Sequence, residues 1–444
     1  MSAEELWGQQ TQMAMKHFAI GGETLPREFI RALGLVKHCA ALANIDCLQL
    51  EKNIALAIAE SSLEVINGEH DQQFPLTIWQ SGSGTQTHMN ANEVIANLAT
   101  QQLNSRIQVH PNDHCNMGQS TNDSFSTAMH IATVEQIQLQ LLPALTKMQQ
   151  VMAEHSKQWQ SIIKIGRTHL QDATPLTLGQ QFSAYAAQLQ TNIDRLKQAN
   201  AELYAIPQGG TAVGSGLNCS AEFAENFARQ LSEFTRLPFA ASDNKLSLQA
   251  AHDGLVNVSG VLNTLAVSLN KIAADIRLLG SGPRCGIGEL HLPENEAGSS
   301  IMPGKVNPTQ CESMLMVCAQ VMGNHVTITL AGAQGQLELN TYKPLMIFLL
   351  LQSIRLLKDV INSFTEYCLR GLEPDRPQIE AFLNNSLMLV TVLSPVIGYD
   401  NASLIAQQAH SNGTTLREEA VRSGLITAEA FDELIQPENM LGPR

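Results

Sequence analysis

Apolar residues between positions 255 and 279 recur at alternating intervals of three and four residues. The series consists of Leu255, Val258, Leu262, Leu265, Leu269, Ile272, Ile276 and Leu279. This 3.5-residue repeat is typical of a helix that packs nearly antiparallel to its neighbours in a bundle or coiled coil. At a rise of about 1.5 Å per residue, such a helix extends for about 37 Å. We expect it to end at Gly280, because the breaker run SGP follows.

Four further stretches favour long helices: 126–158, 176–204, 309–331 and 343–370. Thr174 and Pro175 are expected to begin the second helix, as its N-cap and its first helical residue. Thr309 and Glu312 have the spacing of a capping box at the start of the third. Strands that alternate apolar and polar residues are scarce, and no βαβ rhythm or internal repeat is evident. The pattern predicts an all-α fold with a central bundle of very long helices.

Changes in composition suggest where domains begin and end. Loops rich in Gly, Ser and Asn are expected at 81–92 and 110–122, and the run GLEPDR at 371–376 interrupts the helical pattern. We therefore predict an N-terminal domain over 1–119, a central long-helix domain over 120–374 and a small C-terminal helical domain over 375–444.

The charge of the chain limits its partners. Its 444 residues include 41 acidic and 27 basic ones, for a formal net charge of -14. This excess disfavours nucleic acid and anionic membranes, although a site can be locally positive. Charged residues make up only 15% of the chain, compared with about 25% in typical domains. Surface hidden in an oligomer would explain this deficit, and so would glutamines that replace charges on the exterior.

The cysteines and the N-terminus indicate the compartment. The eight cysteines are scattered, without a CxxC pair or the spacing of a zinc site. We interpret them as free, buried thiols in a reducing environment. The N-terminal MSAEELWGQQ is polar and acidic, unlike a signal or transit peptide, and no apolar run reaches the roughly 18 residues of a membrane span. A soluble cytoplasmic protein is expected.

Four polar segments interrupt the helical pattern: 81-SGSGTQTHMNAN-92, 118-GQSTND-123, 166-GRTHLQDATP-175 and 298-GSSIMPGKVNPTQCE-312. Each alone is equally well explained as a connection between helices. Together they supply hydroxyls, amides, turns rich in N–H groups, one His and one Lys, with few carboxylates. That combination suits an anion with several negative oxygens.

The same residue types suit the removal of a proton beside a carboxylate. Lys305, Asn307 and loop N–H groups could stabilise the charge that spreads into that carboxylate. Histidine is the side chain best suited to exchanging a proton near neutral pH, so His169 is the candidate for an acid or for activating a water. A serine could serve as the base only if surrounding N–H groups stabilised its oxyanion.

The segment GSSIMPGKVNP resembles the signature loop of the aspartase/fumarase superfamily. Similarity to class II fumarate hydratases continues along nearly the whole chain, in the family's order and approximate spacing. The similar stretches include 73-QFPLTIWQSGSGTQT-87, 109-VHPND-113, 163-IKIGRTHLQDATPLTLGQ-180, 209-GGTAVGSGLN-218, 281-SGPRCGIGEL-290, 386-SLMLVT-391 and 397-IGYD-400. The resemblance implies reversible hydration of fumarate to L-malate through an aci-carboxylate intermediate, as in the tricarboxylic acid cycle, with no cofactor or metal. It also implies a three-domain fold that forms a twenty-helix core in a homotetramer, whose active sites are each shared by three subunits.

The resemblance also implies residue roles. Ser299 would be the base that removes the C3 proton of malate, and His169, polarised by Glu312, would activate the water. Lys305 and Asn307 would bind a substrate carboxylate and stabilise the intermediate. The other implied substrate contacts are Ser83, Gly84, Thr85, Ser120, Thr121, Asn122, Thr168, Ser300 and Val306. The HPND run of His110, Pro111, Asn112 and Asp113 resembles the family's second anion site.

Some of these residues also have structural interpretations. Ser299 could be a turn serine, and Glu312 at N3 of a capping box would still be free to pair with His169. His110 and His114 are four residues apart, but the proline between them opposes a helix, and no acidic cluster completes a metal site. The segment 209-GGTAVGSG-216 lacks the GK[ST] ending of a P-loop and is interpreted as a helix-breaking loop near the site.

The chain departs from the family pattern in a few places. Thr121 replaces a serine found in many fumarases, and aspartases often carry the same STND run. His88 stands where both families usually carry Asn. Arg106 alone remains of a basic pair before the HPND run, so a weaker second anion site is expected.

Two other functions stay open at this stage. An aspartase-like ammonia-lyase is favoured by the STND run and opposed by HPND and NPTQCE. A catalytically silent helical scaffold is opposed by the presence of Ser299, His169 and Lys305.

Overall fold

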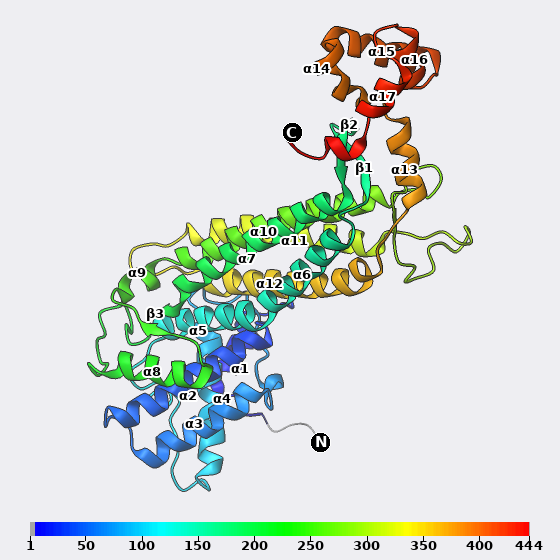
Figure 1. The fold of residues 1–444 in the computed structure, drawn as a ribbon. Coiled ribbons are helices and arrows are strands. Elements are labelled where there is room, and N and C mark those ends of the chain that lie inside the picture. Colours follow the sequence, from blue (N-terminus) through cyan, green and yellow to red (C-terminus); the bar gives the residue numbers. More distant parts are fainter. Residues whose placement is uncertain (1–4, 444) are drawn as a thin grey trace. The chain divides into compact units, whose positions relative to one another are not determined.

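The computed structural model describes residues 5–443, and helices dominate it (Figure 1). The strands among the described residues form three two-stranded sheets. The pairs are antiparallel β1 (Ile163–Thr168) with β2 (Gln171–Thr177), parallel β3 (Ala205–Ile206) with β4 (Ala240–Ala241), and antiparallel β5 (Leu290–His291) with β6 (Glu373–Pro374). The predicted all-α fold is confirmed, with these short strands as small additions.

The α-helices are α1 (Gln9–His17), α2 (Arg27–Asp46), α3 (Lys52–Asn67), α4 (Thr85–Gln102), α5 (Thr121–Gln136), α6 (Leu142–Gln158), α7 (Leu178–Ala201), α8 (Phe223–Thr235), α9 (Lys245–Ala250), α10 (Asp253–Leu279), α11 (Thr309–Gly332), α12 (Lys343–Tyr367), α13 (Arg376–Asn385), α14 (Ser394–Ile397), α15 (Tyr399–Asn412), α16 (Leu416–Arg422) and α17 (Ala428–Leu434). A π turn, η2 (Ile137–Leu141), joins α5 to α6. The short 3₁₀ segments are η1 (Asp71–Gln73), η3 (Glu202–Tyr204), η4 (Leu369–Gly371), η5 (Leu387–Leu393) and η6 (Pro437–Met440).

The described chain divides into two compact units, and the longest helices contribute residues to both. Unit 1 contains the chain as far as Ala144 together with Asn192–Val267 and Met316–Asp359. Unit 2 contains Leu145–Thr191, Ser268–Leu315 and the chain from Val360 onward. The three-domain division with boundaries at 119/120 and 374/375 stays a prediction.

The predicted apolar seam lies on α10, and all of its residues from Leu255 to Leu279 are buried. The helix ends where expected, with the Gly280 N–H bonded to the Ile276 carbonyl at 2.9 Å. Polar contacts accompany the apolar packing between long helices. In unit 2, the Tyr185 hydroxyl of α7 donates to Asp275 of α10 at 2.7 Å. The seam therefore has the helix-packing role that its spacing predicted.

The predicted start of α7 is wrong, because Thr174 and Pro175 lie in strand β2, where Pro175 pairs with Ile165. The helix is capped by Thr177 instead. Its hydroxyl accepts from the Gln180 N–H at 2.9 Å, and the Gln180 side-chain oxygen accepts from the Thr177 N–H at 2.8 Å. This reciprocal pair is a capping box that starts three residues later than predicted.

The predicted capping box at the start of α11 is also wrong. The Thr309 hydroxyl donates to the Glu296 carboxylate at 2.8 Å, so it does not cap the helix. The Glu312 N–H bonds to the Pro308 carbonyl at 3.0 Å, as in an ordinary first helical turn. The helix itself covers the predicted stretch, whereas α12 starts as predicted at Lys343 and ends at Tyr367, three residues before the predicted end.

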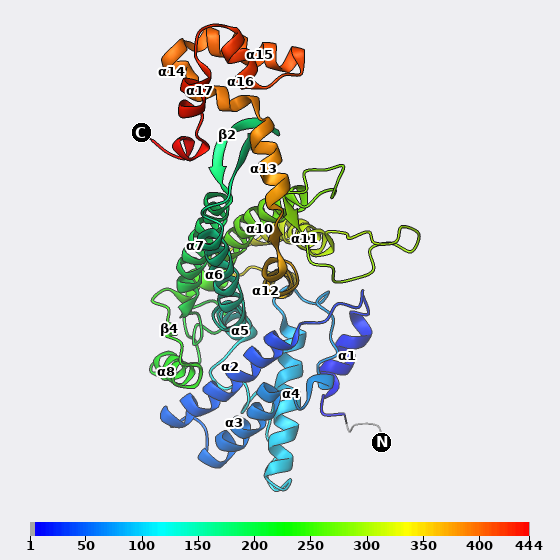
Figure 2. The same ribbon diagram turned by 45° about the vertical axis from the view of Figure 1, so that its right-hand side comes forward.

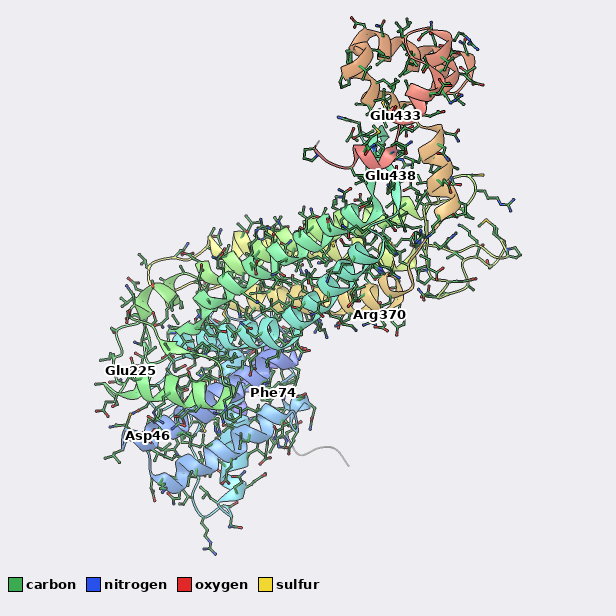
Figure 3. The ribbon with its side chains drawn as sticks, in the orientation of Figure 1. Asp46, Phe74, Glu225, Arg370, Glu433 and Glu438 are labelled. Atoms are coloured by element: carbon green, nitrogen blue, oxygen red, sulfur yellow. The ribbon has the colours of Figure 1, made fainter. Side chains whose placement is uncertain are left out.

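In unit 1, α2, α3 and α4 pack together around buried residues that include Phe29, Leu33 and Ile58 (Figure 1). Asp46, labelled in Figure 3, is the last residue of α2 and accepts from Arg229 of α8 at 2.7 Å. Within this unit, α4 packs on α3 and α5 packs on α2.

In unit 2, the hairpin of β1 and β2 packs against α13, η5 and η6, and Figure 2 shows α13 beside it. Ile165 of the hairpin belongs to a buried cluster with Leu389, Leu393, Ile405 and Ala420. This apolar cluster fixes the base of the hairpin and so supports the residues at its tip.

One helix among the described residues, α11, is long and apolar enough to cross a membrane by length and composition alone. A third of its most apolar window is buried within the chain. The bent pair Arg376–Asn385 and Leu387–Ile397 passes the same test only if it is taken as one span. The core helix of a soluble protein also meets this criterion.

Candidate active site

In unit 1, a chain of hydroxyl groups leads to the first turn of α4. The buried Ser83 Oγ lies 2.9 Å from Ser81 Oγ and 2.7 Å from Thr85 Oγ1. Gly84 precedes the helix with φ of 82°, and an added Cβ would lie 2.2 Å from the Phe125 ring. Only glycine fits this position, which explains the SGSGT run.

The loop predicted at 81–92 is wrong from Thr85 onward, because α4 begins there. His88, Asn90 and Asn92 are polar and made the segment resemble a loop, but all three are buried on the helix. Their polarity serves internal hydrogen bonds, such as that from Asn90 to the Gln73 carbonyl at 3.0 Å.

The N-terminus of α5 contains three predicted substrate contacts. Ser120 is its N-cap: its Oγ accepts from the Asn122 N–H at 3.2 Å, and its own N–H donates to Asp123 at 2.8 Å. The Asn122 amide donates to the Ala212 carbonyl at 2.7 Å. Thr121 follows the cap and starts the helix. The positive end of the helix dipole there suits an anionic ligand.

Asp123 connects this helix end to the glycine-rich segment 209–216. Its Oδ2 accepts from the N–H groups of Gly209 at 3.1 Å and Thr211 at 2.9 Å. Burial raises the pKa of this carboxyl to about 6, against the effect of its backbone hydrogen bonds and of Lys37. The interpretation of 209–216 as a loop is confirmed, and the loop lies beside residues 120–123.

Two buried lysines that the sequence analysis missed also lie behind α5. Lys343 Nζ donates to the Asn122 carbonyl at 3.0 Å and to Ser126 Oγ at 3.1 Å. Lys37 Nζ lies 2.7 Å from His88 Nε2. Neither ammonium forms an ion pair within residues 5–443. Burial lowers the pKa of each to about 7.

A sequence signal for Lys37 exists. The residue follows Leu33 by four positions and Phe29 by eight, so it falls on the apolar face of α2. A lysine at such a position is rarely buried without a specific partner. Lys343 has no comparable signal, because it is the first residue of its helix.

In unit 2, the segment 166–175 belongs to a β-hairpin, so its interpretation as a simple connection between helices is wrong. Thr168 and Gln171 are the last paired residues, and His169 and Leu170 form the turn with φ of 56° and 60°. Positive φ at both central residues is the geometry of a type I′ turn, which keeps the twist of the two strands. This turn places the imidazole of His169 at the tip of the hairpin.

Three charged groups that sequence reasoning also missed support the hairpin. The buried Glu289 carboxylate lies 2.9 Å from Lys164 Nζ and 2.7 Å from an Arg167 nitrogen. Burial lowers the pKa of Lys164, while the charge of Glu289 opposes that change. Glu289 is at least 122 positions from both cations, so periodicity gave no indication of the cluster.

The 298–312 loop remains outside helices until Thr309, as predicted. Ser299 Oγ accepts from the N–H groups of Ile301 at 3.3 Å and Met302 at 3.1 Å. The Asn307 side chain donates to the Gly298 carbonyl and holds the two ends of the loop together. Acceptance from the N–H groups two and three residues ahead is the pattern of a turn serine, which is the structural interpretation given for Ser299 above.

The exposed part of this loop extends from Ser300 to Val306 and includes Lys305, while Ser299 is half-buried. The Lys305 N–H donates to the Met302 carbonyl at 3.3 Å, and Gly304 adopts a left-handed φ of 76°. The loop is therefore internally hydrogen-bonded while its side chains stay accessible to a ligand.

Comparison with known proteins decides the family. The Lyase family model matches residues 1–323, and the model for the fumarase C C-terminus matches 389–442. The chain is 55% identical over 440 residues to fumarate hydratase class II of Rickettsia felis, covering 98% of this chain and 95% of that protein. It is 52% identical over 446 residues to mitochondrial fumarate hydratase 1 of Arabidopsis thaliana, covering 99% and 90% of the two chains. The chain belongs to the class II fumarate hydratase family.

Solved structures agree with this assignment. The crystal structure of class II fumarase from Schistosoma mansoni is similar with a TM-score of 0.98 and 42% identity, covering 100% of this chain and 97% of that one. The resemblance to class II fumarate hydratases that the polar segments indicated is thus confirmed.

In this family member, the Glu312 carboxylate lies 3.6 Å from Arg277. His169 makes no hydrogen bond or ion pair within the part of the chain that the structure describes. The pairing of His169 with Glu312 therefore stays a prediction.

The HPND run forms a compact exposed turn of unit 1. His110 Nδ1 accepts from the N–H groups of Asn112 at 3.2 Å and Asp113 at 3.0 Å. The His110 N–H in turn donates to His114 Nδ1 at 2.9 Å. One nitrogen of each imidazole is thereby committed to the turn.

Proposed function

We propose that this chain catalyses the reversible hydration of fumarate to L-malate by a carbanion mechanism. Membership of the class II fumarate hydratase family supports the reaction. Among the site residues, the observation that carries the mechanism is Ser299, whose Oγ accepts two loop N–H groups. This environment lowers the cost of a serine oxyanion, which is the form that can remove a proton.

When malate is dehydrated to fumarate, the Ser299 oxyanion removes a proton from C3 of malate. The electron pair of the broken C–H bond moves into the adjacent carboxylate and forms the aci-carboxylate. Lys305 and Asn307 stabilise its additional negative charge. The C2 hydroxyl then leaves as water, assisted by a proton from the His169 side, with Glu312 as the partner of that imidazole. Collapse of the intermediate forms the double bond of fumarate.

The substrate carboxylates are proposed to be held by hydroxyl, amide and N–H groups of the polar segments. The proposed contacts are Ser83, Gly84, Thr85, Ser120, Thr121, Asn122, Thr168, Ser300 and Val306, in addition to Lys305 and Asn307. The buried Lys37 and Lys343 add positive charge behind the start of α5, which favours a dianionic substrate.

We also propose a homotetramer with a twenty-helix core, in which each active site is shared by three subunits. Support comes from α11, where Met316, Ala319, Gly323, Val326 and Leu330 are all exposed. Their intervals of three and four residues form a second apolar seam opposite the buried face. Met316, Val326 and Leu330 are 68%, 59% and 62% exposed in the single chain. A second copy of the chain is the occupant that matches such a seam.

The remaining proposals concern organisation and location. The three domains predicted from the sequence, 1–119, 120–374 and 375–444, would appear as separate fragments in limited proteolysis. The turn at 110–113 would bind a second anion weakly, since one nitrogen of each imidazole is already hydrogen-bonded within the turn.

Cytoplasmic location is supported by eight free cysteines, of which Cys285 alone is exposed. Cell fractionation tests this location. The prediction that the thiols are free is confirmed, and most are at least partly buried.

Ultraviolet absorbance of fumarate tests the reaction directly. The full-length protein, dialysed against a chelator, is incubated separately with L-malate and with L-aspartate. We expect fumarate from malate alone, with undiminished activity after chelation, because no step requires a metal. Fumarate from aspartate would identify an ammonia-lyase. Silence with both substrates would contradict the proposed function and favour the scaffold alternative.

A further inference from the structure

We propose that His88 is a positioning residue that directs the Thr121 hydroxyl toward a substrate carboxylate. The inference rests on the proposed function, because it takes Thr121 as a substrate contact. His88 is buried on α4, and its ring connects two other elements. Nε2 lies 2.7 Å from Lys37 Nζ on α2, and Nδ1 lies 2.8 Å from Thr121 Oγ1 on α5.

The three N–H groups of the Lys37 ammonium each have one acceptor. Besides His88 Nε2, they meet Asn116 Oδ1 at 3.1 Å and Gln119 Oε1 at 2.9 Å. The orientation of both amides is fixed, because the Asn116 amide nitrogen donates to the Gln119 carbonyl at 3.2 Å and that of Gln119 donates to the Cys115 carbonyl at 3.2 Å. Since an ammonium can only donate, His88 Nε2 must accept.

This contact fixes the tautomer of His88. A neutral imidazole whose Nε2 accepts carries its proton on Nδ1, so Nδ1 donates to Thr121 Oγ1. Burial and the nearby charges of Lys37 and Lys343 lower the pKa of His88, which keeps the ring neutral. The Thr121 oxygen then serves as an acceptor toward the imidazole, and its own proton points elsewhere.

The direction of that proton matters for an anionic ligand. Thr121 lies in the first turn of α5, next to the N-cap Ser120 and to Asn122. With its oxygen occupied by His88, the hydroxyl donates to a carboxylate instead of accepting from a neighbour. Lys37, His88 and Thr121 thus form a one-way series of hydrogen bonds that ends at the substrate.

Two substitutions separate the two ends of the imidazole. In H88N, the amide nitrogen takes the place of Nδ1 and still donates a hydrogen bond to Thr121. The shorter side chain no longer reaches Lys37. In H88Q, the amide reaches the Nε2 position beside Lys37 and leaves Thr121 without its donor. T121V removes the hydroxyl itself. Assays at pH 6.0 keep Lys37 protonated, since burial places its pKa at about 7.

We expect H88Q and T121V each to raise KM for malate about tenfold, with a smaller change in kcat, because a hydrogen bond to a charged ligand is lost. H88N should restore most of the affinity, with a KM at least threefold below that of H88Q. The H88Q/T121V double variant should match T121V within about twofold, because both changes remove the same contact. H70Q is the histidine control, since His70 pairs only with Glu64 at 2.8 Å.

Equal KM values for H88N and H88Q, or independent effects of H88Q and T121V, would overturn the positioning role. Thermal unfolding of each variant separates this result from loss of fold. Calorimetric binding of succinate, a C4 dicarboxylate that cannot react, gives a second measure that needs no turnover. If the wild-type protein binds succinate but does not convert malate, the proposed function fails while the His88 test still applies.

Discussion

The carboxylate of Glu289 lies 2.7 Å from the guanidinium of Arg167, and Glu289 is fully buried. Lys164 completes the cluster from the same strand. Two cations on β1 and one carboxylate thereby tie the base of the hairpin to the segment before β5. His169 is two residues beyond Arg167, so this ion cluster supports a residue that is proposed to handle a proton.

Glu289→Gln should lower the free energy of unfolding by about 3 kcal/mol, because removing one partner leaves buried cations uncompensated. The measurement is urea unfolding at neutral pH and fixed protein concentration. Glu294→Gln is the matched control, since Glu294 is exposed and its loss should change stability by less than about 0.5 kcal/mol. Equal midpoints for the two variants would mean that the cluster contributes nothing to stability.

Ser299→Ala should reduce kcat by at least about a hundredfold, because the base that removes the C3 proton is lost. Succinate binding and the oligomeric state should be retained, since Ser299 lies on an exposed loop. Steady-state assays with malate, together with light scattering, check both expectations. Turnover near that of the wild-type protein would exclude Ser299 as the base.

His169→Asn separates chemistry from backbone geometry. Asn tolerates the left-handed φ of 56° at this position, so the hairpin turn should persist. Loss of the imidazole should still lower kcat at least about a hundredfold, because no group remains to transfer the proton to the departing hydroxyl. If the activity falls only as far as the fraction of tetrameric protein falls, His169 has a structural role instead.

Lys343 should make stability depend on pH. Its pKa is lowered from 10.5 to about 7 in the folded chain, mainly by burial. Between these values the unfolded chain binds more protons, so the free energy of unfolding rises with pH by up to about 1.4 kcal/mol per unit. The penalty for burying the charge is fully present below pH 7 and is relieved as pH rises.

Lys343→Met removes this dependence. The free energy of unfolding of the wild-type protein, minus that of the variant, should therefore increase as pH rises from 7 to 9. Urea unfolding at several pH values gives the difference directly. A difference that stays constant over this range would show that Lys343 titrates normally in the folded protein.

Val326→Arg should prevent assembly of the proposed tetramer. Val326 lies in the exposed apolar seam of α11 and is 59% exposed in the single chain, so a charge there costs little in a monomer. Buried between copies, the same charge would lack a partner. Light scattering should show smaller species with little activity. Arg at the exposed Leu48, outside the seam, should leave the assembly intact.

The sequence by itself determined the elements with a strong period. The 3.5-residue seam from Leu255 to Leu279 fixed α10, because each apolar position had to face the same side of one helix. The polar segments also identified the family and the candidate site, since loops that hold a ligand carry residue types that packing does not require.

Only the tertiary structure decided the partners of those residues. The turn of His169 and Leu170 depends on strand pairing between β1 and β2, which local propensity at Thr174-Pro175 did not indicate. The contacts of Lys37 with His88 and of Lys164 with Glu289 join residues 51 and 125 positions apart. A buried charge is tolerated because of the acceptors that surround it in space, and sequence spacing contains no information about them.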